Sequence, residues 1–137
     1  MSVEYLAHTA DVRMRVQGKT LEGLFRDAVK GMGNILKDDF CKQTHQVNRK
    51  VMVEVKASDN TNLLIDFLSQ VLTQSHIENT VFWDVEIIEL SEFKIRAKLS
   101  GTQVDRYDED IKAVTYHEAN VKQNKKGFWE TCIIFDI

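Results

Sequence analysis

The chain has 137 residues, of which 43% are hydrophobic, and this is typical of one domain with a sizeable core. No run of about 18 apolar residues could span a membrane, and the first residues lack the basic and apolar segments of a secretory signal, so we expect a cytoplasmic protein. The net charge of −3, from 18 basic and 21 acidic residues, disfavours extensive nucleic-acid binding. No repeat or linker divides residues 1–137, and Cys41 and Cys132 are interpreted as reduced thiols.

The first third of the chain predicts a strand and a helix. Residues 12–17 alternate between apolar and polar side chains, as in a half-buried strand. Thr20 is a suitable N-cap, and apolar residues then recur at helical spacing from Leu21 to Leu36. Residues 38–48 are polar and mixed, and we expect a loop there.

The rest of the chain predicts one more helix and five strands. Alternation indicates the strands, and a segment rich in capping residues at 58–61 indicates the start of the helix. Ser91 and Glu92 separate two of the strands, which we expect to form a hairpin. The predicted ranges are a strand at 51–57, a helix through 63–72, strands at 81–87 and 93–99, and strands at 111–122 and 128–136 around a turn at 124–127.

The predicted order is therefore strand, helix, strand, helix and four strands. Adjacent strands with few helices indicate an α+β fold and disfavour a doubly wound parallel sheet. We expect two amphipathic helices packed on a largely antiparallel β-sheet layer, within a single domain of residues 1–137.

A polar segment, His8-Thr9-Ala10-Asp11, stands at the entrance to the first clear strand. It contains neither glycine nor proline, so it differs from an ordinary turn. One interpretation is that Thr9 and Asp11 cap backbone donors in a bend. The alternative is a functional site, and the residues alone leave both open.

The chain end places the side chain of Asp136 next to the α-carboxylate of Ile137. If Asp11 joins them, three carboxylates converge, which is costly unless a divalent cation or a basic side chain neutralises them. Oxygen ligands favour Ca²⁺, Mg²⁺ or Mn²⁺ over zinc. The alternative is a frayed, solvated terminus. Lys112, on a predicted strand, is either a solvated edge charge or, near such a cluster, a contact to a nucleotide phosphate or a partner acid.

These segments together resemble the archease family. They occur in the order of the family and span nearly the whole chain. The matching segments are His8-Thr9-Ala10-Asp11; Gly18-x-Thr20-Leu21-x-x-Leu24-Phe25-x-x-Ala28; Asn62-Leu63-Leu64-x-x-Phe67-Leu68; Ile111-Lys112-Ala113-Val114-Thr115-Tyr116-His117; Gly127-x-Trp129; and Phe135-Asp136-Ile137.

The resemblance implies a helper protein that is not itself an enzyme. Archeases activate the RtcB-type tRNA-splicing RNA ligase by promoting its guanylylation and multiple turnover, so GTP and tRNA would be engaged through the ligase. The family binds a divalent cation, here expected to be calcium, with magnesium or manganese as alternatives. Carried over, the metal ligands are Asp11, Asp136 and Ile137, and Lys112 and His8 are expected to contact the partner or its nucleotide.

Two departures from the family pattern concern Arg13, where many relatives have a small residue, and the acidic loop 105–110, which is shorter than in many relatives. The alternative function is a tRNA-binding or chaperone module that acts on RNA directly. A self-sufficient metal hydrolase is disfavoured because no base–nucleophile pair is evident. The basic and aromatic cluster that the RNA-binding alternative would need is formed by Lys122, Lys125, Lys126, Phe128 and Trp129.

Overall fold

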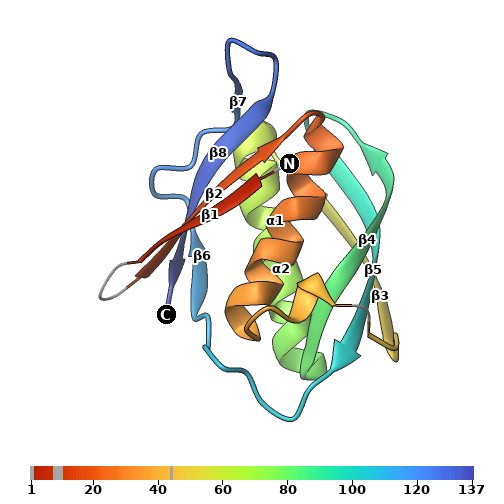
Figure 1. Ribbon diagram of the computed structural model, residues 1–137. Coiled ribbons are helices and arrows are strands. Elements are labelled where there is room, and N and C mark those ends of the chain that lie inside the picture. Colours follow the sequence, from red (N-terminus) through yellow and green to blue (C-terminus); the bar gives the residue numbers. More distant parts are fainter. Residues whose placement is uncertain (1, 8–10, 44) are drawn as a thin grey trace.

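The computed structural model describes residues 2–7, 11–43 and 45–137, and in it two helices lie between two β-sheets (Figure 1). Every strand pair that is described is antiparallel, so the α+β class is confirmed. The elements are β1 (Ser2–Ala7), β2 (Asp11–Gly18), α1 (Leu21–Leu36), the short 3-10 helix η1 (Phe40–Lys42), β3 (Arg49–Lys56), α2 (Asn60–Glu78), β4 (Thr80–Leu90), β5 (Lys94–Gln103), β6 (Ala113–Thr115), β7 (Lys122–Gln123) and β8 (Trp129–Asp136).

Both helices begin where the sequence supplies a capping side chain. The Thr20 hydroxyl accepts the amide of Gly23 at 3.0 Å, and the Asp59 carboxylate accepts the amide of Asn62 at 2.8 Å. These bonds satisfy amides of the first turn that have no partner within the helix. Helix α2 ends at Asn79, which adopts the left-handed conformation that often terminates helices.

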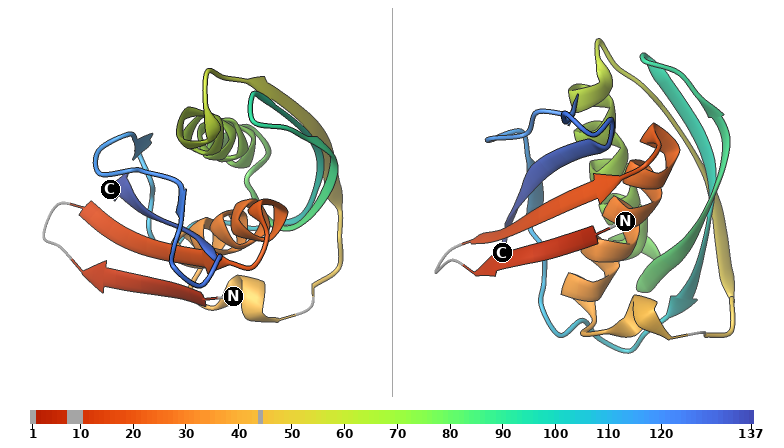
Figure 2. Two further views of the ribbon diagram at one scale, coloured as in Figure 1. Left: turned by 90° about the horizontal axis from the view of Figure 1, so that it is seen from above. Right: turned by 45° about the horizontal axis from the view of Figure 1, so that its top comes forward.

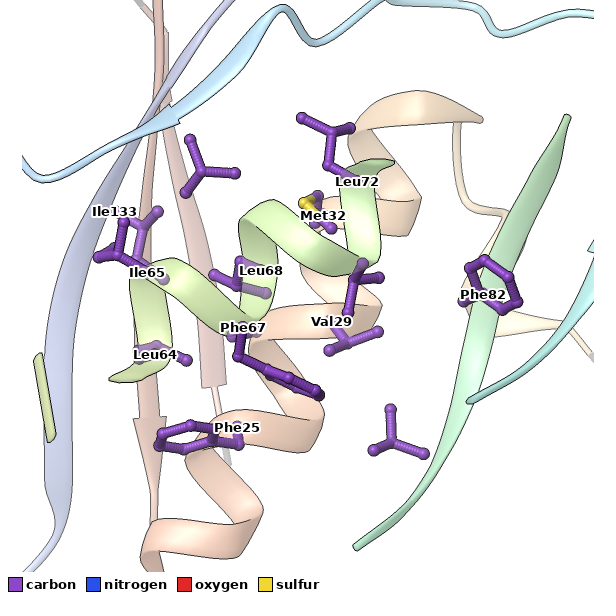
Figure 3. Packing of buried hydrophobic residues seen from close by; sticks show 14 of the residues in the cluster. Phe25, Val29, Met32, Leu64, Ile65, Phe67, Leu68, Leu72, Phe82 and Ile133 are labelled. Atoms are coloured by element: carbon purple, nitrogen blue, oxygen red, sulfur yellow. The ribbon is translucent and has the colours of Figure 1, made fainter. Parts of the chain in front are cut away.

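The strands form two sheets, where the sequence suggested one layer. Sheet A has the order β1-β2-β8-β6, with β7 also paired to β8, and sheet B has the order β3-β5-β4. Figure 2 shows α1 and α2 between them. Each helix therefore covers apolar side chains on both sides, and Phe25 of α1 meets Phe67 of α2 with ring centroids 5.9 Å apart at the centre of the core (Figure 3).

Two of the sequence-based expectations about strands need correction. Residues 2–7 form a strand that the sequence analysis did not assign, and it pairs with β2 along its whole length. The continuous strand predicted at 111–122 is wrong. It is divided into β6 and β7, because the chain turns at Glu118, whose φ of 62° is incompatible with a strand. The three-residue β6 and two-residue β7 pair with opposite ends of β8.

Candidate functional site

Asp11 and Asp136 lie directly opposite each other at one end of sheet A. They are register partners at the first position of β2 and the last position of β8. Side chains of directly opposed residues project to the same face, with Cβ atoms about 4.5–5.5 Å apart. That face is the solvent side of the sheet, because the neighbouring pair Val12 and Phe135 projects into the core. The structure thus brings together two carboxylates that are 125 positions apart in the sequence.

β6 lies on the other side of Asp136. Ala113 is the register partner of Asp136 on this strand, and the amide of Lys112 donates to the Asp136 carbonyl at 2.7 Å. The Lys112 side chain is exposed. The lysine backbone is therefore fixed beside the carboxylate pair, and its side chain is accessible to a partner.

Ile137 follows Asp136 directly, and its half-buried side chain packs against the core cluster. This contact anchors the end of β8, so the described chain end is held beside the carboxylates. His8, together with Thr9 and Ala10, lies outside the described residues.

Loop 104–112 leads into Lys112 and is attached to the end of α1. The Asp108 carboxylate accepts the amide of Asp38 at 3.0 Å and the Lys37 ammonium at 3.4 Å. The backbone hydrogen bond from Asp38, supported by Lys37, lowers the pKa of Asp108. The Asp108 amide in turn donates to the Leu36 carbonyl at 2.7 Å, so this acidic loop is connected to α1 through both backbone and side chain.

The chain matches the model of the Archease protein family (MTH1598/TM1083) over residues 3–137. The chain belongs to this family. The archease of Methanosarcina mazei is 31% identical over 142 residues, which cover 98% of this chain and 94% of that protein. The archease of Pyrococcus abyssi is 32% identical over 143 residues, which cover 98% and 97% of the two chains.

Two solved structures share the fold. The solution structure of Methanobacterium thermoautotrophicum protein 1598 has a TM-score of 0.78 and 25% identity, and the match covers 98% of each chain. A crystal structure from Thermotoga maritima, described as an archease and possible chaperone, has a TM-score of 0.65. Its 13% identity, over all of this chain and 98% of that chain, supports the fold alone.

The donor set at the end of sheet A suits a hard divalent cation, because both side chains are carboxylates on one face of the sheet, with Asp136 exposed and Asp11 half-buried. Like charges directly opposite each other on a sheet are destabilising unless a cation offsets them. Among the described residues, however, no three His, Cys, Asp or Glu side chains come close enough to hold a metal ion. Further ligands of a metal in this family member would therefore be backbone or terminal oxygens, water or groups of a partner.

The basic cluster considered for RNA lies at the other end of β8, on the β7–β8 hairpin. Lys122, Lys125 and Lys126 are exposed there, but Trp129 packs against the core and Phe128 is half-buried. Base stacking needs accessible aromatic faces. The lysine charges of this cluster are therefore accessible, but little of its aromatic surface is available for stacking on bases.

A cavity of about 610 Å³ opens on the solvent face of sheet A, and neither Asp11 nor Asp136 lines it. Its walls mix two basic residues, Arg15 and Lys122, with three acidic ones, Glu4, Glu118 and Glu130, so they form no uniform binding surface for an anion or a cation. Cys132 also lines it, but burial raises the pKa of this thiol, which disfavours the reactive thiolate. Both cysteines are free thiols, as predicted.

One contact that the sequence does not predict links β2 to the segment after β6. Arg13 and Glu118, 105 positions apart, form an ion pair on the solvent face of sheet A. Arg13 was noted as a departure from the family pattern, but its partner could not be found from the sequence, because Glu118 lay in a predicted strand.

No helix in the described part of the chain is long and apolar enough to cross a membrane.

Proposed function

We propose that this protein is a cytoplasmic activator of an RtcB-type tRNA-splicing RNA ligase, and that it promotes guanylylation and multiple turnover of the ligase without being an enzyme itself. The observation that carries the proposal is the pairing of Asp11 with Asp136 in a chain that belongs to the archease family. GTP and tRNA are engaged through the ligase.

We propose that Asp11 and Asp136, with the α-carboxylate of Ile137, hold a divalent cation, calcium first and magnesium or manganese as alternatives. When bound, the cation supplies charge neutralisation for phosphate groups. The two side chains are an incomplete ligand set by themselves. An incomplete set on a solvent-facing surface fits a site whose remaining ligands come from water, the ligase or its nucleotide.

Lys112 and His8 are proposed to contact the ligase or its nucleotide. The accessibility of the Lys112 side chain, together with the bond from its amide to Asp136, supports this role for the lysine. A compact ammonium group that reaches a phosphate bound at the cation would add a second positive charge to it. Nucleotidyl transfer depends mainly on such positioning and charge neutralisation, so a partner protein can stimulate it.

The test is guanylylation of the cognate ligase with labelled GTP, in the presence of wild type, Asp11→Ala or Asp136→Ala. We expect both variants to lose most of the stimulation. Asp84→Ala is the matched control, because Asp84 is an exposed strand aspartate of sheet B. Stimulation at the wild-type level by both Asp11→Ala and Asp136→Ala would show that the proposed site is wrong.

Multiple-turnover ligation with and without the protein tests the partner itself, and no effect of wild-type protein on the ligase would refute the proposed function.

A tag after Ile137 tests the third ligand, because it converts the α-carboxylate into a peptide. Unchanged calcium affinity of the tagged protein would exclude that carboxylate as a ligand. Binding of tRNA alone, with a steep loss on raising salt, would instead favour the RNA-binding alternative.

A further inference from the structure

The segment 116–121, between β6 and β7, does not pair with β8. Side-chain contacts attach it to the neighbouring elements instead. We call it the β6–β7 loop. Its ties come from β2, β8 and α2, so the loop wraps around the edge of sheet A. Besides the ion pair of Arg13 with Glu118, the contacts are the Tyr116 hydroxyl donating to the Asp66 carboxylate, the Asn120 amide donating to Thr131 Oγ1 at 3.0 Å, and the Val121 amide donating to Thr61 Oγ1 at 2.9 Å.

The contact at the tip of this loop is the ion pair between Arg13 and Glu118. Arg13 Nη2 lies 3.1 Å from Oε1 and 2.9 Å from Oε2 of Glu118. Glu118 has a φ of 62°, in the left-handed region that residues other than glycine rarely occupy. A residue keeps such a conformation only where its surroundings stabilise it. For Glu118, the ion pair with Arg13 is the contact that fixes its side chain.

The burial of Ile134 shows how closely this contact covers the sheet. By register, Ile134 shares the solvent face with Arg13 on β2 and with Thr115 on β6. Nevertheless only 4% of Ile134 is exposed. The arginine and the residues after β6 thus shield an outward-facing apolar side chain from water, as the long stem of an arginine readily does.

β6 depends on such contacts, because it is too short to be held by its backbone alone. It makes three register pairs with β8, whereas β2 makes eight. At its start it is fixed by the buried Ile111 and by the Lys112 amide on Asp136. At its end it is fixed by Thr115, whose hydroxyl donates to the Ile134 carbonyl at 3.0 Å, and by the β6–β7 loop.

We propose that Arg13 and Glu118 are positioning residues, whose ion pair holds β6 on the edge of β8 and so keeps Lys112 beside Asp136. The effect on the ligase rests on the proposed function of Lys112, but the effect on β6 does not. The carboxylate pair itself is carried by the long β2–β8 pairing. The ion pair therefore controls the placement of Lys112, and breaking it leaves Asp11 and Asp136 paired across β2 and β8.

The test compares Arg13→Ala with Arg15→Ala. Arg15 is the next outward-facing arginine of β2. It lines the same cavity as Glu118, but its ion pair is with Glu4 of β1, at 3.8 Å. In Arg13→Ala we expect amide hydrogen exchange at Lys112 and in β6 to accelerate about 2- to 5-fold, the range that corresponds to a partly exposed ion pair. Exchange in the centre of β2 should not change. Stimulation of ligase guanylylation should fall toward that of Lys112→Ala, while calcium binding measured by calorimetry should not be weakened, because the variant removes a positive charge from the face that carries Asp11.

Two further variants keep the proposal falsifiable if Arg13→Ala does not fold. Glu118→Gln removes the charge and keeps the shape, and should reproduce both losses. The exchanged pair, Arg13→Glu with Glu118→Arg, should restore slow exchange at Lys112. Wild-type exchange at Lys112 in Arg13→Ala, or in Glu118→Gln if the former is unfolded, would overturn the proposal. Equal effects of Arg15→Ala would also overturn it. A wild-type protein that fails to stimulate the ligase would instead refute the proposed function, and hydrogen exchange would still decide the role of the ion pair.

Discussion

The two strands that flank Asp136 are held in different ways. On one side β2 pairs with β8 over eight residues, and its inward side chains Met14 and Val16 belong to the core. On the other side β6 pairs over three residues and is continued by segments that side chains attach to α1, α2 and β2. The carboxylate pair therefore lies on the side that is held by the long β2–β8 pairing, which we call the rigid side. Lys112 lies on the side that is held by a short strand and several separate side-chain contacts.

This difference suggests that the two sides of the candidate site have different roles, cation binding on one side and partner contact on the other. A cation site needs ligands at fixed separation, which a long antiparallel pair provides. A side chain that engages a partner can tolerate, or even require, a locally less stable segment. The two sides should therefore respond differently to substitution.

The largest effect is expected from Phe135→Ala on the rigid side. Phe135 is fully buried in β8 and lies opposite Val12 on one side and Val114 on the other. Removing its ring should lower the free energy of unfolding by about 3–5 kcal/mol. Urea denaturation measures the change, and Met52→Ala, at a site that is 55% exposed, is the control with little effect. A loss below that of an ordinary surface substitution would show that β8 is not central to the core.

A smaller effect is expected from calcium. A ligand that binds only the folded state at about 100 times its Kd raises the free energy of unfolding by about 2.7 kcal/mol. We expect this increase in the wild type and in Asp84→Asn, and its loss in Asp136→Asn. Thermal denaturation with calcium or with a chelator measures it. An equal gain in Asp136→Asn would place calcium elsewhere.

The rigid side was also the predictable side. The alternation in residues 12–17 and 128–136 and the helical spacing from Leu21 to Leu36 reflect burial against one core, and these elements were found close to their true bounds. The convergence of Asp11 and Asp136 followed from the family resemblance. The residues alone could not decide it, because strand pairing partners are not encoded locally.

The other side could not be predicted, and the reason is physical. The apolar and β-branched residues of 111–122 favour a strand, but the conformation of Glu118 is set by contacts with distant residues such as Arg13. Tertiary contacts of this kind leave no periodic signal in the sequence. The division into two sheets was missed for a related reason, since helices that are apolar on two sides can serve one layer or two.

A modest effect is expected from Thr131→Val, which removes a tie of the β6–β7 loop. Thr131 is 7% exposed, and its hydroxyl accepts the amide of Asn120. Losing this hydrogen bond should cost about 1 kcal/mol. We expect faster amide exchange at Asn120 and little change in β2. Thr73→Val is the control, because that hydroxyl donates to Ser69 within α2. Exchange at Asn120 that matches the wild type would show that the loop does not need this tie.

The smallest effect is expected from protonating Asp108, which attaches loop 104–112 to the end of α1. The ionised carboxylate accepts the Asp38 amide, so its pKa in the folded state lies below the ordinary 3.8. A lowered pKa means that the attachment is complete above about pH 4 and is lost as the pH falls through the lowered value. The Asp38 amide shift in NMR spectra should follow this titration, and Asp108→Asn should abolish it. An Asp38 shift that titrates at the ordinary value would mean that the bond adds nothing. Because residues 109–111 join this attachment directly to Lys112, its loss at low pH should also lower the protection factor of the Lys112 amide, which compares its exchange rate with that of an unstructured peptide at the same pH. The β2 amides opposite Asp136 should keep their protection.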